Sequence, residues 1–442
     1  MKPHSQDLET IKEKIKPETR EFQAGVGLSR SWDPRQAGEE AIVSALENLS
    51  KKPKFVLLFS TIHYSKEKGG MKAFVEAAYD SLPKGTQMIG GTVAGFINNY
   101  GCFTRGATAL AVYSKDMDVA VGYGENTKRA PHLAAKKCAE MIRRGLEGSK
   151  YKNKFLLSFI SAGKIPDIMG RRKVFKGRLA RLYPLLYAIS LYILQKGVGR
   201  EDEVLDTLTE NLSEYKIISG SLMDDMRILE NYQFLNNNVF SNSIVALGIS
   251  TDLNGDVYTT HGLQRTPIKF KITKLSRDQR IIHEINNKPA TRELLEILRW
   301  PETYFDENMY KRVFYYPLAF ENENNVVPLV IGVIFQDSIL VTYKIKNPEL
   351  SILTTSGKNL VKTVTENLQM FRNKNLKFGV ISSCAIRLET LGMNVYKIRN
   401  ILLEFFKEKP FILIYVGGES TYSPEKGLKY GNDTFNTLII YE

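Results

Sequence analysis

The stretch KFVLLFS, residues 54–60, is a short apolar run between polar residues, which is typical of a strand buried on both faces of a sheet. The next segment, residues 71–82, carries its apolar residues on one helical stripe and ends before Pro83. Residues 88–91 (MIGG) then predict a second strand that ends in glycines. Two further strands are predicted at residues 106–114 and 118–124.

The same order of elements returns twice along the chain. The second copy is predicted to have strands at residues 153–161, 216–225, 242–250 and 256–262 and a helix at residues 203–215. The third copy is predicted to have strands at residues 377–383, 411–420 and 435–442 and a helix at residues 395–407. A unit of strand, helix, glycine-ended strand, loop and strand is therefore predicted three times.

This repetition predicts the fold class. Two parallel strands need a crossover helix, and that helix covers one face of the sheet. We therefore expect an α/β protein in which repeated strand-helix-strand-strand units form two mixed-sheet layered domains. Ligands in open α/β sheets bind beyond the carboxyl ends of the strands, so the glycine-ended edges are candidate binding sites. The glycines concerned are Gly90, Gly91, Gly220, Gly417 and Gly418, and each of them also fits a plain turn.

The composition excludes several classes of protein. Hydrophobic residues make up 43% and charged residues 25% of the 442 positions, which is ordinary globular usage and argues against disorder. Uncharged apolar runs reach only about fourteen residues, fewer than the roughly 20 that a transmembrane helix needs. The charged N-terminus lacks the apolar run of a secretory signal. Three separated cysteines, Cys102, Cys138 and Cys384, favour a reducing, cytoplasmic location.

The net charge of +13 favours attraction to polyanions. The basic residues are nevertheless mostly scattered among acidic ones. No helix-turn-helix, zinc-finger or aromatic RNA-binding signature accompanies them, so no nucleic-acid partner is expected.

Five motifs resemble those of the FIST domains, the F-box and intracellular signal transduction proteins. They are GGTVAGF (90–96), GSLMDD (220–225), SCAIRLETLG (383–392), VGGES (416–420) and GNDTF (431–435). The stretches THGLQRT (260–266) and residues 269–294 are similar to that family's junction, where a strand, a hairpin and a Pro-Ala helix start follow one another.

The resemblance implies a charged extension at residues 1–21, a FIST N-like domain at 22–265 and a FIST C-like domain at 266–442. It also implies a non-enzymatic sensory module that binds small molecules such as amino acids. Because the two halves take up the chain, we expect the signal to pass to a separate partner protein.

Residues near two strand ends of the third copy suggest how a small polar ligand, such as an amino acid, would bind. Cys384 and Arg387 follow the first strand, and Glu419 follows the second. Arg387 would hold a carboxylate and Glu419 an ammonium group. Asn432 and Thr434 would add neutral hydrogen bonds. An ion pair between Arg387 and Glu419 that braces two loops explains the same residues.

Other candidate sites are less specific. Asp224 and Asp225 follow the second-copy glycine and are expected to cap a loop, with Asp225 a candidate ligand contact. A hydrolase or transferase that uses Cys384 or the Glu419 region is the enzymatic alternative, although no signature supplies a base for Cys384. Some FIST relatives are described as haem-binding sensors, and the candidate axial ligands here would be His63, His261 and His283. No attachment motif supports haem, and neither a cofactor nor a metal is predicted.

The second copy contains an insertion at about residues 167–200. Its first part carries six basic residues without an acidic one, and residues 182–195 (LYPLLYAISLYILQ) are uncharged and aromatic-rich. This composition is typical of a segment that lies on an anionic membrane or docks into a partner. The interpretation favoured over this one is a solvated basic loop that leads into a core helix covering the sheet, in which case Leu186, Ile189, Tyr192 and Ile193 would be buried. The six basic residues are Arg171, Arg172, Lys173, Lys176, Arg178 and Arg181.

Overall fold

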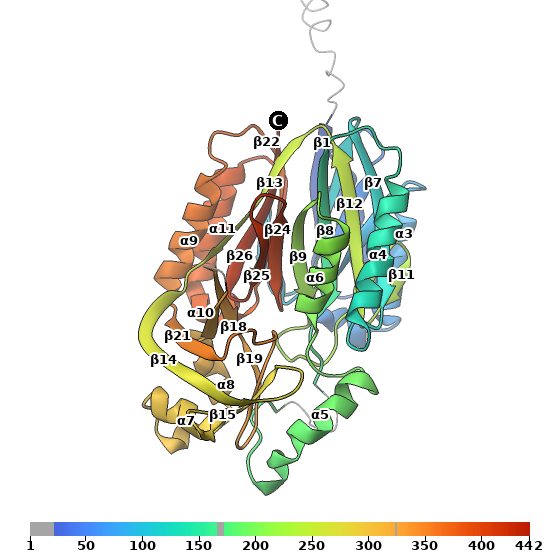
Figure 1. Cartoon of the computed structure of the whole chain (residues 1–442). Helices are drawn as coiled ribbons and strands as arrows, with labels where there is room; N and C mark the ends of the chain where they lie inside the picture. Colours follow the sequence, from blue (N-terminus) through green and yellow to red (C-terminus); the bar gives the residue numbers. More distant parts are fainter. Residues whose placement is uncertain (1–21, 166–171, 323–324) are drawn as a thin grey trace, which may run out of the picture.

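The computed structural model describes residues 22–165, 172–322 and 325–442. The predicted extension at residues 1–21 and the predicted contact residue Arg171 lie outside the described residues. Three six-stranded mixed sheets stand side by side, and a fourth sheet lies below them in Figure 1.

The first repeat builds one sheet and two covering helices. Its elements are β1 (Phe22–Ser29), α2 (Pro34–Leu46), β2 (Phe55–Ser60), η1 (Ile62–Lys66), α3 (Gly70–Asp80), β3 (Gln87–Thr92), β4 (Gly95–Asn98), β5 (Gly101–Phe103) and β6 (Ala107–Ser114). Strands β2 and β3 are parallel and α3 connects them, while β6 runs antiparallel to β2. The predicted strand, helix, strand and strand at residues 54–114 are confirmed, but the strand predicted at residues 118–124 is β7 (Met117–Glu125), which pairs with β12 (Ser243–Thr251) in the second sheet.

The second repeat has the same connectivity and carries the insertion. Its elements are β7 (Met117–Glu125), α4 (Pro131–Gly145), β8 (Asn153–Ser161), η3 (Arg178–Arg181), α5 (Tyr183–Tyr192), α6 (Glu201–Asn211), β9 (Lys216–Leu222), β10 (Gln233–Leu235), β11 (Asn238–Phe240) and β12 (Ser243–Thr251). Strands β8 and β9 are parallel, and β12 runs antiparallel to β8.

The third repeat is interrupted by an inserted sheet after its first strand. Its elements are β13 (Asn254–His261), α9 (Gly357–Gln369), β22 (Leu376–Cys384), α10 (Ile386–Leu391), η6 (Gly392–Asn394), α11 (Val395–Phe406), β23 (Phe411–Val416), β24 (Glu419–Ser423), β25 (Gly427–Gly431) and β26 (Thr434–Tyr441). Strands β22 and β23 are parallel, and β26 runs antiparallel to β22. The single strand predicted at residues 411–420 is in fact two strands separated at Gly417 and Gly418.

Each repeat gives a hairpin to the sheet of another repeat. The hairpin β4–β5 of the first repeat pairs with β23 of the third, and β10–β11 of the second pairs with β3 of the first. The hairpin β24–β25 of the third repeat pairs with β9 of the second. This exchange closes a ring of three sheets. It also joins strands across the predicted division at residues 265 and 266, and that division stays a prediction.

The three sheets face a shared hydrophobic core. Phe55, Leu57 and Phe59 of β2 point into it together with residues of β8 and β22 such as Leu157 and Val380. The alternate residues of β2, including Val56 and Leu58, pack under α2 and α3. Burial on both faces explains why residues 54–60 form an unbroken apolar run rather than an alternating one.

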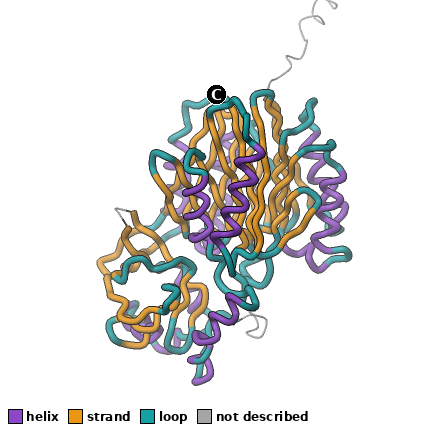
Figure 2. Tube along the Cα trace, turned by 45° about the vertical axis from the view of Figure 1, so that its right-hand side comes forward, coloured by secondary structure: helices purple, strands orange, loops and turns teal. Residues whose placement is uncertain are grey.

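The inserted sheet and the helices between its strands follow β13 in the chain. The strands are β14 (Gln264–Leu275), β15 (Ile281–Ile285), β16 (Lys288–Pro289), β17 (Leu318–Asn322), β18 (Asn325–Leu329), β19 (Ile331–Ile334), β20 (Ile339–Val341) and β21 (Glu349–Thr354), and the helices are α7 (Ala290–Ile297), η4 (Glu302–Tyr304), α8 (Met309–Arg312) and η5 (Val313–Tyr315). The long strand β14 leaves the three sheets and curves around this unit (Figure 1). The strand, hairpin and helix order expected at residues 269–294 is confirmed. Figure 2 shows this unit and α5 together at one end of the molecule.

The α/β class and the repeated units are confirmed by this arrangement. Within residues 22–165, 172–322 and 325–442, no helix is long and apolar enough to cross a membrane.

Candidate functional site

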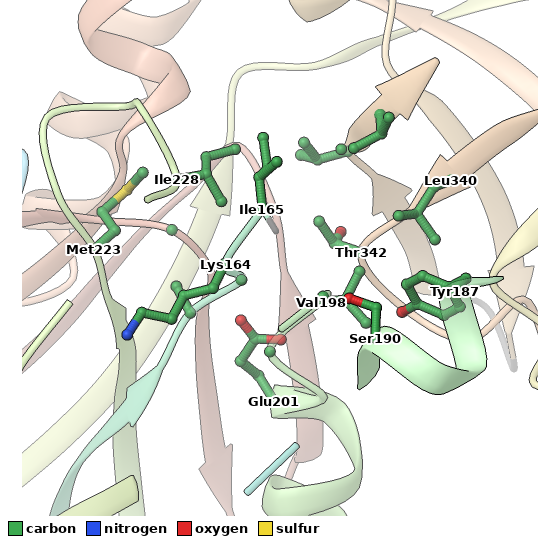
Figure 3. A pocket seen from close by; sticks show the side chains of 18 of the residues that line it. Lys164, Ile165, Tyr187, Ser190, Val198, Glu201, Met223, Ile228, Leu340 and Thr342 are labelled. Carbon is green, nitrogen blue, oxygen red and sulfur yellow. The ribbon is translucent and has the colours of Figure 1, made fainter. Parts of the chain in front are cut away.

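A cavity of about 260 Å³ lies where the carboxyl ends of two pairs of parallel strands, β8 with β9 and β22 with β23, meet the inserted sheet (Figure 3). Ala162 follows β8, Met223 follows β9, Cys384 ends β22 and Gly417 follows β23, and all four line the cavity. Strands β19 and β20 close it from the inserted sheet, and α5 closes another side. The cavity therefore occupies the position that the α/β topology favours for ligands.

The walls of this cavity are almost entirely apolar. Glu201 is the acidic residue and Lys164 the basic residue among the described side chains that line it. Figure 3 shows the Glu201 carboxyl, at the start of α6, directed into the cavity. The Lys164 ammonium is directed away from the cavity in the same view and donates to the Ser241 hydroxyl (3.0 Å).

Burial raises the pKa of Glu201, because a charged carboxyl is poorly solvated there. Lys128 is fully buried nearby, and burial lowers its pKa. Its Nζ donates to the Ser161 hydroxyl (3.0 Å) and to the Ala162 carbonyl (2.9 Å). The Glu201 carboxyl therefore changes its protonation state more easily near neutral pH than an exposed glutamate does.

Three buried polar atoms on the cavity residues have no hydrogen-bond partner. They are Glu201 Oε2, Thr342 Oγ1 and Tyr187 Oη. Buried polar groups normally have partners, so such atoms mark the place where a water molecule or a ligand binds. The cavity therefore offers a few polar groups within apolar walls, which suits a ligand that has a single polar head.

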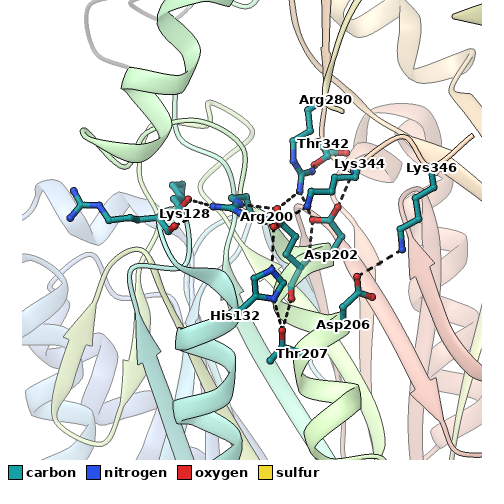
Figure 4. A network of polar contacts seen from close by, with 12 residues as sticks. Lys128, His132, Arg200, Asp202, Asp206, Thr207, Arg280, Thr342, Lys344 and Lys346 are labelled. Carbon is teal, nitrogen blue, oxygen red and sulfur yellow. Dashed lines mark hydrogen bonds and ion pairs between the residues drawn. The ribbon is translucent and has the colours of Figure 1, made fainter. Parts of the chain in front are cut away.

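An ion-pair network fixes the start of α6 against the inserted sheet (Figure 4). Arg280 Nη2 lies 2.6 Å from Asp202 Oδ1 and 3.0 Å from Glu203 Oε1. Arg200 binds both oxygens of Glu203, and Lys344 Nζ lies 3.0 Å from Glu203 Oε2. Arg280 also donates to the Thr342 carbonyl. The network therefore ties the first turn of α6, which carries Glu201, to the segment that carries Thr342.

The residues predicted to bind an amino acid form a buried polar cluster behind the cavity. Glu419 Oε1 accepts hydrogen bonds from the Thr434 backbone N–H (2.7 Å) and hydroxyl (2.8 Å). Arg387 donates to the carbonyls of Asp433 (3.3 Å) and Leu360 (3.0 Å) rather than forming the alternative ion pair with Glu419. Asn432 Nδ2 donates to the Pro328 carbonyl (3.0 Å).

Several atoms of this cluster lack partners. They are Arg387 Nε, Glu419 Oε2, Asn432 Oδ1 and both carboxyl oxygens of Asp433. Burial raises the pKa of Glu419 to about 8 and that of Asp433 to about 7. Sequence reasoning brought Arg387, Glu419, Asn432 and Thr434 together correctly, but it missed Asp433, which lies between two of them in the chain.

The cluster does not open directly into the cavity. Of the predicted residues in this region, Cys384 and Gly417 line the cavity, and Thr434 lines a separate hollow of about 490 Å³. The side chains of Arg387, Glu419 and Asn432 line neither space. Ligand binding by these residues stays a prediction.

Cys384 is a poor nucleophile in this structure. It is 1% exposed, and burial raises the pKa of its thiol well above the ordinary value. A thiol held protonated does not attack, so the geometry disfavours the enzymatic alternative at this residue.

The predicted glycines serve close packing. Gly90 and Gly91 lie inside β3, and a Cβ atom on Gly90 would lie 1.7 Å from the Leu58 carbonyl oxygen. Gly220 pairs with Glu419 across β9 and β24. The Gly418 carbonyl accepts a hydrogen bond from the Ser221 N–H (2.7 Å).

The adjacent residues Asp224 and Asp225 differ in burial and in their hydrogen-bond or ion-pair partners. Asp224 is buried and accepts hydrogen bonds from the backbone of Ile228 and Leu229, which confirms the expected loop capping. Asp225 is exposed and forms an ion pair with Arg227. Asp225 does not line the cavity.

The residues present do not fit haem ligation by histidine in this cavity. None of His63, His261 and His283 lines it, and His261 lies at the separate hollow. In the described part of the chain, no three His, Cys, Asp or Glu residues gather as metal ligands do.

The insertion differs from a core helix. Leu186, Ile189, Tyr192 and Ile193 are 48%, 50%, 41% and 65% exposed, so the expectation that they pack in the core is wrong. The basic residues of the insertion have different surroundings. Lys173 donates to the Met226 carbonyl, Lys176 lies over the Phe305 ring, Arg181 pairs with Asp337, and Arg172 and Arg178 are exposed.

Sequence reasoning missed the polar residues of the cavity. Glu201 was placed before the predicted helix, and an acidic first turn is common at helix starts because of the helix dipole. Thr342 belongs to a segment with no predicted site, and Tyr187 belongs to the apolar segment at residues 182–195, for which no ligand contact is predicted. An acidic residue at a helix start shortly after Gly197 and Gly199 was the available signal for Glu201, but it does not distinguish a ligand contact from a cap.

Comparisons with known proteins agree with the FIST N part of the resemblance seen in the sequence. A family model described as the FIST N domain matches residues 54–288. No curated protein matches the chain. Among solved structures, PurLQS from Thermotoga maritima aligns at a TM-score of 0.20 and 11% identity, over 95% of this chain and 72% of that chain, and this likeness is too low to support an argument.

Proposed function

Because this chain belongs to the FIST family, whose members are sensory domains, we propose that it is a cytoplasmic sensory module that binds a small molecule in the cavity at Glu201 and signals through a separate partner. The observation that carries the proposal is an apolar cavity whose lining residues include three unpartnered polar atoms. The ligand has an apolar body and one amine or hydroxyl head.

The head group follows from the charges at the cavity. An amine donates to Glu201 Oε2 and pairs with the carboxylate, and a hydroxyl exchanges hydrogen bonds with Glu201 and Thr342. A free carboxylate on the ligand would face Glu201, and the basic residue of the lining directs its ammonium elsewhere. The polar amino acid expected from the sequence is therefore the second candidate, and the unpartnered atoms around Arg387 and Glu419 favour it.

The size of the cavity limits the ligand. A volume of 260 Å³ equals about nine molecules of liquid water, which suits a body of one ring with a short chain. Burying such a body in an apolar site contributes most of the affinity, and the head group contributes orientation.

Ligand occupancy can be transmitted because the cavity joins two parts of the fold. Glu201 belongs to the second repeat, whereas Gly332, Leu340 and Thr342 belong to the inserted sheet or its flanking loop. A ligand that contacts both parts stabilises the arrangement in which they lie together. A partner that recognises this arrangement would sense the ligand.

A series of compounds with one apolar body tests the proposal. Thermal shifts are measured with 2-phenylethylamine, 2-phenylethanol, 3-phenylpropionate and phenylalanine, because a ligand of the folded state raises the apparent melting temperature. We expect the amine and the alcohol to raise it and the propionate to leave it unchanged. A shift with none of the four would overturn the proposal for this ligand class.

Variants locate the binding. Glu201→Gln should remove most of the amine shift, while Glu214→Gln, which changes an exposed carboxylate, should keep it. Gly332→Leu should block all ligands, because a side chain there enters nearly open space beside the cavity. A phenylalanine shift that survives Glu201→Gln and is lost in Arg387→Gln would instead support the amino-acid candidate.

A further inference from the structure

The helix α5 leaves an unusual amount of apolar surface exposed. Eight of the eighteen large hydrophobic residues exposed in the described chain lie between Leu179 and Leu194. Monomeric proteins rarely leave such a concentration in water unless it contacts something else. This exposed α5 surface includes Leu179, Leu182, Leu185, Ile189, Ile193 and Leu194.

The exposed residues lie on one side of a helix that is anchored by its other side. Tyr187 and Leu191, four positions apart, are buried against β19, β20 and Phe335 of the inserted sheet. Leu182, Leu185 and Ile189 recur at the spacing of the opposite helical face. The helix therefore has one apolar face that packs against the inserted sheet and a second apolar face that is exposed and available for an external contact.

The charge of the segment identifies the contact. Between Arg172 and Arg200 the sequence contains seven basic residues and no Asp or Glu. Of these residues Arg172 and Arg178 are exposed, whereas Arg181 pairs with Asp337 and Arg200 with Glu203. Apolar side chains at helical spacing that are flanked by cations match an anionic lipid surface, where the side chains enter the acyl boundary and the cations meet phosphate.

The position of α5 in the fold leaves this helix accessible to a planar surface. Helix α5 lies at the end of the molecule opposite the C-terminus, beyond the three sheets (Figure 1). The Arg129 guanidinium donates to the carbonyls of Tyr192 (2.8 Å) and Ile193 (3.2 Å), which holds the end of the helix on the protein. A planar surface can approach α5 without meeting the sheets.

We infer that the exposed α5 surface docks on an anionic bilayer, with Leu185 and Ile193 entering the lipid and Arg172 and Arg178 contacting its headgroups. Leu186, Ile189 and Leu194 are exposed and also line the cavity, so the docked face lies next to the cavity wall. The ligand of the cavity would then be exchanged at the membrane surface. The docking itself does not depend on the ligand proposed above.

Sedimentation of the full chain with vesicles tests the docking. We expect binding to phosphatidylcholine vesicles that contain phosphatidylglycerol, weaker binding to phosphatidylcholine alone, and release by salt. The combined variant Leu179→Ser, Leu185→Ser, Ile193→Ser should bind about tenfold more weakly or worse, because it removes the side chains that enter the lipid. These three side chains do not line the cavity.

Matched variants exclude a general effect of surface hydrophobicity. Leu133→Ser with Met393→Ser changes side chains that are equally exposed elsewhere and should leave vesicle binding unchanged. Arg172→Gln and Arg178→Gln should each weaken binding to anionic vesicles about fivefold. Circular dichroism and melting temperature confirm that each variant is folded.

Two results would overturn the inference. One is equal vesicle binding by the triple-serine variant and the parent chain. The other is absence of vesicle binding together with self-association that the triple-serine variant abolishes, which would make this surface a contact between two copies. Glu201→Gln should bind vesicles normally, so a failure of the ligand proposal is distinguishable from a failure of the docking.

Discussion

Arg280 reaches Asp202 across the boundary between the inserted sheet and the second repeat, with Nη2 2.6 Å from Oδ1. Both side chains are buried, and they lie 78 positions apart in the sequence. Their contact places the loop before β15 against the first turn of α6, next to Glu201. The geometry of the candidate site therefore depends on an ion pair that joins two units of the fold.

Replacing Arg280 by Ala should destabilise the protein strongly. The substitution leaves Asp202 without its buried cation and weakens the pairing of Glu203, and breaking a buried pair typically costs about 3–5 kcal/mol. Urea unfolding measures the loss. Arg265→Ala is the control, because its ion pair with Glu321 is exposed and should contribute less than about 1 kcal/mol. Equal losses in the two variants would contradict this account.

Gly90 should tolerate no side chain. In Gly90→Ala the new methyl group would lie 1.7 Å from the Leu58 carbonyl oxygen, so β2 and β3 must separate, and we expect a loss of at least about 3 kcal/mol. Gly332→Ala adds the same methyl group where the nearest atom is 3.7 Å away and should change stability by less than about 0.5 kcal/mol. Thermal or urea unfolding compares the two variants, and similar stabilities would show that the close packing at β3 is not required.

Stability should depend on pH through Glu419. Burial raises its pKa from 4.5 to about 8, so the folded state keeps a proton that the unfolded chain loses. The stabilisation is fully present below pH 4.5 and is lost as the pH rises through 8. Glu419→Gln cannot titrate, and the difference in unfolding free energy between parent and variant should change by a few kcal/mol from pH 5 to pH 8. A constant difference over this range would mean that Glu419 has an ordinary pKa.

The three thiols should differ in reactivity. Cys138 and Cys384 are buried, and burial raises the pKa of each thiol, whereas Cys102 is only partly buried. With a thiol reagent at pH 8, the native protein should therefore react first at Cys102, and Cys102→Ser should leave only slow reaction. All three should react in urea. Rapid modification of Cys384 in the native Cys102→Ser variant would reopen its use as a nucleophile.

The repeated pattern of apolar runs predicted the central strands of the three sheets, but not β1 or the hairpin strands β4, β5, β10, β11 and β25. Residues 54–60, 153–161 and 377–383 were each predicted as strands and form β2, β8 and β22. Burial on both faces produces an apolar run, and a run of this kind is visible without knowledge of its neighbours. The break at Gly417 was not visible, because the backbone there leaves one sheet and enters another, and this depends on which strand lies beside it.

The sequence predicted which site residues lie together only where those residues belong to the same repeat. Glu419 and Thr434 were grouped correctly because β24 and β26 belong to the same repeat. Glu201 and Thr342 were not grouped, since 141 positions separate them and no local pattern marks the inserted sheet as the wall of a cavity. Arg280 also gave no signal, because a basic residue in a polar turn is ordinarily exposed.

The amino-acid sequence by itself determined the α/β class, the threefold repeat and the basic, apolar character of the segment at α5, because periodicity and composition are local properties of the chain. The tertiary structure alone decided that the repeats exchange hairpins around one core, that α5 keeps an apolar face exposed, and that Glu201 meets Thr342 at an apolar cavity. These features arise from contacts between residues far apart in the chain, and the free energy of such contacts depends on which surfaces remain to be buried once the local elements have formed.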